Sequence, residues 1–142
     1  MFLNSWLFWA VLSATFAALT AIFAKVGVGG VSSDFATFYR TVVVVIALAV
    51  LLLTTDQFEL PKLANGMTYL FLTFSGLATG ASWLCYFRAL KIGNASQVAP
   101  VDKLSVVLVA VFAAIFLGER LSSVNWIGVT MIGAGAILVA LR

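Results

Sequence analysis

Long runs of apolar residues, separated by short polar turns, follow one another along almost the whole chain. A helix rises about 1.5 Å per residue, so roughly 20 apolar residues cross a hydrocarbon core about 30 Å thick. These runs lack the alternation of apolar and polar positions that the strands of a membrane β-barrel show. The pattern predicts five transmembrane helices, at residues 6–28, 35–54, 67–90, 96–117 and 124–141.

Residues that favour turns separate the predicted helices. They gather at 27–34, 56–65, 93–94 and 118–123. Asp34 and Ser122 stand where the N-caps of the following helices are expected, since short polar side chains accept hydrogen bonds from the first helical amides. Backbone polar groups cannot stay unpaired in lipid, so helices are expected throughout. The sequence therefore predicts an all-α membrane protein, a five-helix bundle formed by one domain over residues 1–142.

Composition narrows the range of functions. Hydrophobic residues make up 63% of the chain and charged residues 9%, whereas a soluble domain carries about 25% charged residues. The chain has no histidine and one cysteine, Cys85, which excludes an internal disulfide, a Cys/His zinc site and histidine acid–base catalysis. The sequence shows no phosphate-binding loop and no nucleophile beside a base, so we expect neither enzymatic activity nor a cofactor.

The net charge of +3 does not indicate nucleic-acid binding, because the basic residues are scattered singly and form no stripe. We expect these residues to face lipid headgroups and the cytoplasm. Residues 1–5 carry no Lys or Arg, which a cleaved signal peptide would normally have at its start. The run at 6–28 is therefore expected to remain as a permanent helix.

The distribution of Lys and Arg between the two membrane faces predicts an orientation. On the side of the N-terminus lie two basic residues, Lys62 and Arg120. On the opposite side lie five: Lys25, Arg40, Arg88, Lys91 and Arg142. This excess favours an orientation with the N-terminus outside and the C-terminus inside. Lys25 and Arg40 have alternative roles within the membrane, and without them the counts are three and two, so insertion in both orientations stays an alternative.

The predicted helix at 67–90 has two neighbouring stripes of functional interest. One carries hydroxyl groups, at Ser75, Thr79, Ser82 and Tyr86. The other contains Gly76, Gly80, Trp83 and Phe87. Small residues four apart let two helix backbones approach closely in lipid, so we expect Gly76 and Gly80 to pack against another helix. The hydroxyl stripe, together with Trp83, either lines a cavity or bonds back to its own helix.

Asp102 and Lys103 follow Pro100 inside the predicted helix at 96–117. A charged residue at the centre of a membrane helix costs about 2.5–3.5 kcal/mol on insertion scales. Adjacent residues point about 100° apart on a helix, so we expect this pair not to neutralise itself. If the span starts at Ser96, the pair lies about 9 Å below the interface beside a break at Pro100, as in transporter binding sites. Alternatively, Pro100 is the first helical residue and Asp102 interacts with the helix dipole.

Three further features concern helix ends and surfaces. Lys25 ends the first predicted helix and Arg40 lies near the start of the second. Extension of their long side chains to the headgroups is the favoured interpretation, and a role within the membrane is the alternative. Glycines give the helix at 124–141 a thin surface suited to contact with another helix. They are Gly128, Gly133 and Gly135.

Several segments of the chain resemble the EamA domain of the drug/metabolite transporter superfamily. They are Tyr86–Ser96 (YFRALKIGNAS), Val98–Pro100, Phe116–Leu121 (FLGERL), Trp126–Gly128 and Ile132–Gly135. The likeness covers essentially the whole chain and is specific from Ser82 onward. It implies an inner-membrane exporter or facilitator of small metabolites, and a chain that corresponds to one half of a ten-helix fold. The chain lacks the acidic residue that small multidrug-resistance relatives carry in their first helix, which disfavours cationic drugs as substrates.

Two functions follow from the residues and the resemblance together. The first is a secondary transporter or facilitator, most simply an exporter, of a small polar or anionic metabolite. Its expected substrate-binding residues are Lys103, Asp102, Trp83, Tyr86 and Ser82, with Lys25 and Arg40 as outer charges. The second is a non-transporting membrane subunit or scaffold of a heteromeric complex. Because five helices are few for alternating access, we expect a homodimer through the helix at 124–141, with the antiparallel arrangement favoured.

Overall fold

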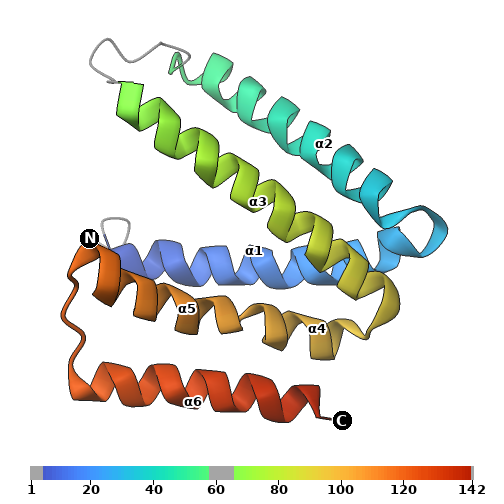
Figure 1. Cartoon of the computed structure of the whole chain (residues 1–142). Coiled ribbons are helices and arrows are strands. Elements are labelled where there is room, and N and C mark those ends of the chain that lie inside the picture. Colours follow the sequence, from blue (N-terminus) through green and yellow to red (C-terminus); the bar gives the residue numbers. More distant parts are fainter. Residues whose placement is uncertain (1–4, 58–65, 142) are drawn as a thin grey trace. The chain divides into compact units, whose positions relative to one another are not determined.

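The computed structural model describes residues 5–57 and 66–141, and helices fill almost all of them, with no strand in these ranges. Figure 1 shows the main helices, which are α1 (Trp6–Gly27), α2 (Ser33–Thr54), α3 (Gly66–Ile92), α4 (Ala95–Asp102), α5 (Leu104–Phe112) and α6 (Ser123–Ala140). Two short helical turns extend them: η2 (Val28–Gly30) after α1, and η3 (Ala113–Leu117) after α5.

Five helical segments in the described ranges are long and apolar enough to cross a membrane. They are Trp6–Gly30, Ser33–Thr54, Gly66–Ile92, Ala95–Leu117 and Ser123–Ala140. Each begins and ends within two residues of the predicted span. The all-α, five-helix membrane fold is therefore confirmed. Most of the predicted turn at 56–65, with Lys62 and the terminal Arg142, lies outside the described residues.

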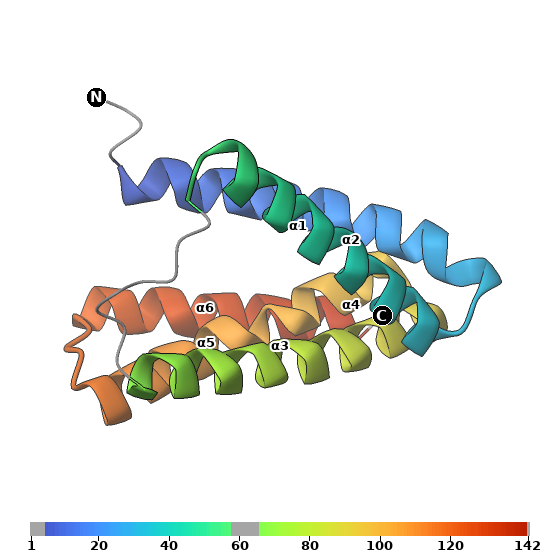
Figure 2. The same cartoon turned by 90° about the horizontal axis from the view of Figure 1, so that it is seen from above.

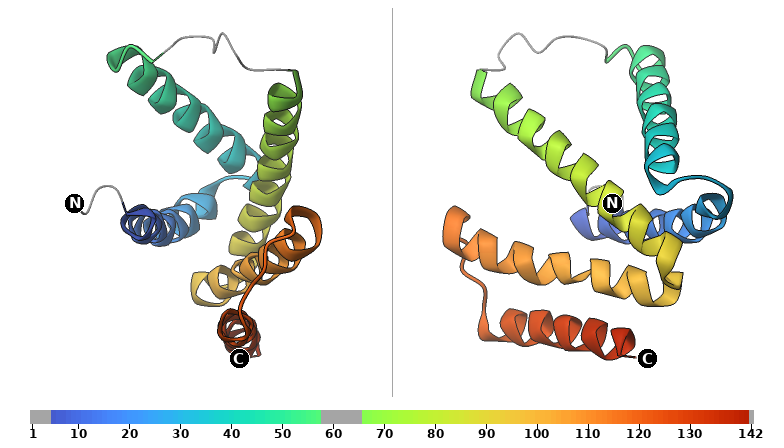
Figure 3. Two further views of the ribbon diagram at one scale, coloured as in Figure 1. Left: turned by 90° about the vertical axis from the view of Figure 1, so that its left-hand side faces the viewer. Right: turned by 45° about the vertical axis from the view of Figure 1, so that its right-hand side comes forward.

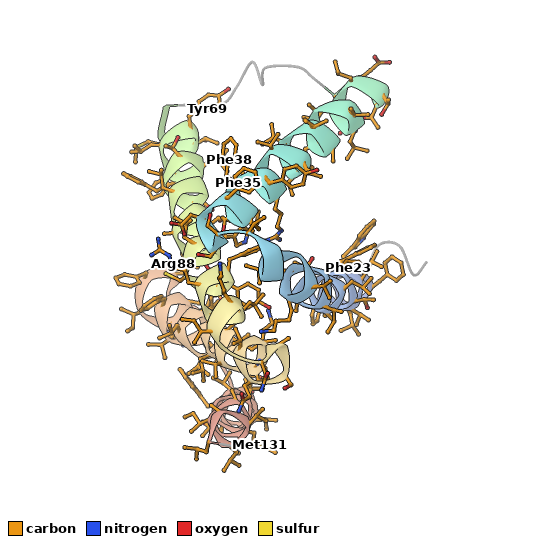
Figure 4. The ribbon with its side chains drawn as sticks, turned by 90° about the vertical axis from the view of Figure 1, so that its right-hand side faces the viewer. Phe23, Phe35, Phe38, Tyr69, Arg88 and Met131 are labelled. Atoms are coloured by element: carbon orange, nitrogen blue, oxygen red, sulfur yellow. The ribbon has the colours of Figure 1, made fainter. Side chains whose placement is uncertain are left out.

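Large apolar side chains cover the outside of the helices. Phe23 on α1 and Met131 on α6 are 69% and 70% exposed, and Figure 4 shows both pointing outward. An apolar surface of this extent has no counterpart in soluble monomers. Lipid is the medium that such a surface requires, so this is a multi-pass membrane protein.

The described chain forms two compact units. Val26–Lys91 makes one, and the segments before and after it make the other. Within the second unit, α4 and α5 both pack against α6, which runs beside them in Figures 1 and 2. The buried residues of α5 and α6 are alanines, Ala110 and Ala136. Such small side chains let helix backbones approach closely where no hydrophobic force drives association.

Gly133 lies at this contact between α5 and α6. A Cβ atom added to Gly133 would stand 3.2 Å from Cγ2 of Val107, whereas nothing lies within 4 Å of one added to Gly128 or Gly135. The three glycines therefore do not form one outer surface. Gly133 faces the interior of its own unit, and the outward surface of α6 keeps only Gly128 and Gly135, seven residues apart on one helix face.

The fourth span is interrupted in the middle of its polar segment. Pro100 lies inside α4, which begins at Ala95, so the interpretation of Pro100 as the first helical residue is wrong. α4 ends at Asp102 and α5 begins at Leu104. Between them, the Lys103 amide donates to the carbonyls of both Ala99 (3.3 Å) and Pro100 (3.1 Å). Sharing one donor between two carbonyls tightens the turn and separates the two helices.

Serine side chains cap two of the helices. Ser122 Oγ accepts a hydrogen bond from the Asn125 amide at 3.2 Å, which confirms the predicted cap of α6. The predicted cap at Asp34 is wrong, because Ser32 accepts from the Phe35 amide at 3.3 Å and α2 already begins at Ser33. The Asp34 carboxylate lies in the first turn of α2, where a negative charge still favours the helix dipole.

In the unit Val26–Lys91, α2 and α3 run antiparallel and meet at one end. Figure 3 shows them close where α2 begins and α3 ends, and diverging toward their other ends. The Arg88 guanidinium holds the Asp34 carboxylate there through two hydrogen bonds, of 3.1 and 3.0 Å. Lys91 Nζ donates to the Val31 carbonyl at 2.7 Å. The end of α3 is thus fastened to the turn that precedes α2.

The glycine that faces α5 gives a direct test of the packing in the second unit. Gly133→Val should lower stability by about 1–3 kcal/mol, because the added methyl groups meet the Val107 side chain. Gly128→Val is the matched control, since its side chain enters open space. Thermal unfolding of the purified monomer in detergent measures both. Equal midpoints for the two variants would contradict this packing of α6, and Val107→Ala should partly restore Gly133→Val.

Candidate functional site

The charged side chains that lie seven or more residues from both ends of the described spans fall into two groups, one in each unit. The first is the ion pair at the break between α4 and α5, made by Asp102 and Lys103. The second is the arginine–aromatic cluster of Arg40 on α2 with Trp83, Tyr86 and Phe87 on α3. Burying charge in a membrane is costly, so such residues mark functional sites more often than structural ones.

Asp102 and Lys103 bind each other. Lys103 Nζ lies 3.3 Å from Asp102 Oδ2, and the expectation that these adjacent residues do not neutralise each other is therefore wrong. The separation of about 100° holds only on a continuous helix, and α4 ends at Asp102. The flexible side chain of Lys103 then brings its ammonium group to the Asp102 carboxylate. The side chains are 54% and 35% exposed for Lys103 and Asp102 respectively, so the pair remains open to a ligand.

The ion pair lies well inside the span. Asp102 is seven residues after the start of α4 at Ala95, a rise of about 10 Å along the helix. Pro100 has no amide hydrogen to donate to the carbonyl of Ser96 four residues earlier. The break thus places a charged pair beside a proline that removes one backbone hydrogen bond from the helix.

Lys25 also has a partner inside the protein. Its Nζ donates to the Gly93 carbonyl at 2.7 Å, which links the end of α1 to the turn before α4. The favoured interpretation, that Lys25 only extends to the headgroups, is therefore wrong, because its ammonium group donates a hydrogen bond to a backbone carbonyl. A turn that exposes its carbonyls is a good acceptor for a lysine at the end of a neighbouring helix.

The arginine–aromatic cluster joins α2 to α3. The Arg40 Cζ atom lies 4.2 Å from the centroid of the Trp83 ring and 5.6 Å from that of Phe87. Both distances are within the range of about 6 Å in which a cation is attracted to a ring face. The ring of Tyr86 lies beside that of Phe87, with the two ring centroids 6.5 Å apart. Arg40 therefore turns toward the rings of α3, and its expected extension to the headgroups is wrong.

The other predicted polar features of α3 are only partly engaged. Thr79 Oγ1 donates to the Ser75 carbonyl at 2.8 Å, so this hydroxyl bonds back to its own helix. Ser82 is exposed. Nothing in the described part of Val26–Lys91 lies within 4 Å of a Cβ atom added to Gly76 or Gly80, so the expected close helix contact at these glycines is not formed within that part.

Sequence reasoning missed two features. The first is the contact of the Phe87 ring with Arg40, for which the spacing of four residues between Trp83 and Phe87 is the available signal. An open groove of about 600 Å³ lies between the start of α4 and the end of α6, lined by Asn94, Ser96, Gln97, Leu138 and Val139. None of the predicted site residues lines it. Among the described residues, no three acidic, cysteine or histidine side chains gather as metal ligands.

Comparison with known proteins agrees with the apolar helices and their internal charges. Residues 4–141 match the EamA-like transporter family. The chain is also similar, with 60% identity over 137 residues, to a Sinorhizobium sp. protein named "Uncharacterized transporter in cobO 3'region". That alignment covers 96% of this chain and 97% of the relative. No solved structure matches the chain. Because the family match spans nearly every residue, this chain belongs to the EamA-like transporter family and is a membrane transporter.

Proposed function

We propose that this transporter exports a small polar or anionic metabolite across the inner cell membrane, as a secondary transporter or facilitator. Each chain would contribute one EamA-like domain over residues 1–142, and two chains would act together. The observation that carries the proposal is the Asp102–Lys103 ion pair at an interruption of the fourth span. Interrupted helices beside charges are the common construction of substrate sites in secondary transporters.

An ion pair of adjacent residues suits reversible binding of an anion. Lys103 can release Asp102 and donate to an anionic group of the substrate, because its side chain is more than half exposed. Asp102 then keeps the site close to neutral while it is empty, which lowers the cost of holding a cation in the membrane. The other residues that we expect to bind substrate are Trp83, Tyr86 and Ser82, with Lys25 and Arg40 as further cations. The two aromatic rings would supply flat apolar surface.

Assembly follows from the number of spans. Five helices are too few both to enclose a cavity and to rock two halves around it, whereas two copies supply ten. The outward face of α6 carries Gly128 and Gly135 with no neighbouring atoms within 4 Å of an added Cβ, which suits close contact with a second copy. The small Lys/Arg bias permits insertion in both orientations, so we favour an antiparallel pair.

Removal of the cation at the break should abolish transport. Proteoliposomes that contain only this chain are loaded with an isotope-labelled metabolite extract, and the efflux is followed by mass spectrometry. Lys103→Ala should stop the efflux that the wild-type chain supports, while helix content and insertion stay unchanged. Arg120→Ala, at an exposed turn outside the spans, is the matched control and should transport normally.

Two results count against this assignment. Wild-type efflux by Lys103→Ala would remove Lys103 from the site and leave Lys25 or Arg40 to hold the anion. No efflux by the purified wild-type chain, with transport restored only by a second protein, would favour the non-transporting subunit.

The dimer is tested by cross-linking on α6. In a Cys85→Ser background, Gly128→Cys or Gly135→Cys should form disulfide-linked pairs, whereas Gly133→Cys should not, because Gly133 faces Val107. C-terminal tags probed from each side of the membrane report orientation. Tags on one side only would exclude the antiparallel pair, and a transporting monomer in nanodiscs would exclude the dimer.

A further inference from the structure

Arg40 lies at a depth where a cation needs compensation. It is seven residues after the start of α2, a rise of about 10 Å, and Trp83 is nine residues before the end of α3, about 13 Å. Half of a hydrocarbon core measures about 15 Å. The guanidinium and its aromatic partner therefore occupy similar depths from the end at which α2 and α3 meet, on the hydrocarbon side of the Asp34–Arg88 ion pair.

The aromatic rings interact with the positive charge of the guanidinium but not with its N–H groups. Ring faces attract the positive charge of Arg40, but they accept none of the hydrogen bonds that its N–H groups can donate from the guanidinium edge. No described residue gives Arg40 an oxygen acceptor in a hydrogen bond or an ion pair. Arg40 as a whole residue is only half-buried. Stacking on the rings thus fixes the orientation of the Arg40 guanidinium and leaves the N–H groups at its edge without an oxygen acceptor among the described residues.

The charges around Arg40 indicate the kind of acceptor that fits. In the described part of Val26–Lys91, the two other cations are already held by oxygen atoms. Arg88 is bound by Asp34, and Lys91 by the Val31 carbonyl. One positive charge is left to match a ligand. A single charge with two parallel donors complements a carboxylate, while a phosphate dianion would call for a second cation.

We propose that Arg40, Trp83 and Tyr86 form a subsite for the carboxylate of a small organic monoanion. The edge of the Arg40 guanidinium donates two parallel hydrogen bonds to the carboxylate, and the aromatic rings hold the guanidinium in place and contact the body of the ligand. The subsite rests on the proposed function only in that the bound anion is the transported solute. It narrows the substrate class from small polar or anionic metabolites to carboxylates.

A lipid phosphate offers similar oxyanion chemistry. Lipid phosphates, however, lie outside the hydrocarbon core, and the Arg40 guanidinium is held over Trp83 on the core side of the Asp34–Arg88 pair. A soluble monoanion is not anchored in the headgroup layer. The solute is therefore the occupant that we propose, and the lipid becomes an outcome of the test.

The fluorescence of Trp83 can report binding at the proposed subsite. The chain has four tryptophans, and Trp6→Phe, Trp9→Phe and Trp126→Phe leave only Trp83. This background protein in phosphatidylcholine nanodiscs is titrated with acetate and benzoate, and in parallel with the neutral analogues acetamide and benzamide. A saturable change in Trp83 emission is expected with the carboxylates, stronger for benzoate, and none with the amides.

Substitutions at Arg40 separate charge from geometry. Arg40→Lys keeps the charge but loses the paired donors, so carboxylate affinity should fall about 10-fold or more, and Arg40→Gln should lose the response. Lys91→Gln is the matched control, because it removes a cation of the same unit that a backbone carbonyl already holds. Its titration should equal that of the background protein. Circular dichroism and gel filtration confirm folding, which the charge-conserving Arg40→Lys variant is chosen to preserve.

The outcomes separate this subsite from the proposed function. No saturable response to either carboxylate, or an unchanged response in Arg40→Gln, overturns the subsite even if proteoliposomes transport. A second outcome is a Trp83 emission that is insensitive to carboxylates and changes with the phosphatidylglycerol content of the nanodisc or with inorganic phosphate. That result assigns Arg40 to a lipid headgroup and also overturns the carboxylate subsite. A carboxylate response lost in Arg40→Gln, without any transport by the purified chain, supports the subsite and overturns the transport function.

Discussion

Hydrocarbon offers no hydrogen-bond partner, and every polar group of this chain that enters the membrane must therefore find one within the protein. Helices follow directly, because they pair their backbone groups within a single segment. The threonine side chains obey the same constraint. Thr15, Thr41, Thr73 and Thr130 each donate to the carbonyl four residues earlier, at 2.7–3.0 Å. Among the described residues, no buried side-chain nitrogen or oxygen lacks a partner.

The same constraint makes the charged residues informative. Four of the cations have oxygen partners: Arg88, Lys91, Lys25 and Lys103. Arg40 is stabilised differently, by the faces of Trp83 and Phe87. A ring face attracts the positive charge but accepts no hydrogen bond from the guanidinium edge, so in the proposed subsite it would stabilise the empty state and still let a ligand bind. Asp102 stabilises Lys103 in the same way, and in the proposed function an anionic group of the solute would take its place.

Local patterns in the sequence predicted the spans closely, because the length of an apolar run and the turn residues beside it decide where a membrane helix begins and ends. The cap at Ser122 was predictable for the same reason. Contacts that depend on an interruption of a helix, or on residues of another helix, could not be predicted in this way. The Asp102–Lys103 contact needs the interruption at Lys103, and the contact of Arg40 with Trp83 joins two different helices. Glycine spacing on α6 was visible, but only packing against Val107 reveals that Gly133 faces inward.

The central claim is that the charged break in the fourth span is a substrate site inside the membrane, and chemical accessibility tests it most directly. In a Cys85→Ser background, Lys103→Cys is reacted with a membrane-impermeant maleimide, and Glu119→Cys at the exposed turn serves as the reference. The predicted result is that Lys103→Cys is labelled slowly. The metabolites that the wild-type chain exports should reduce this labelling rate further. Labelling as fast as that of Glu119→Cys, without protection by those metabolites, would place the break at the membrane surface and contradict the claim.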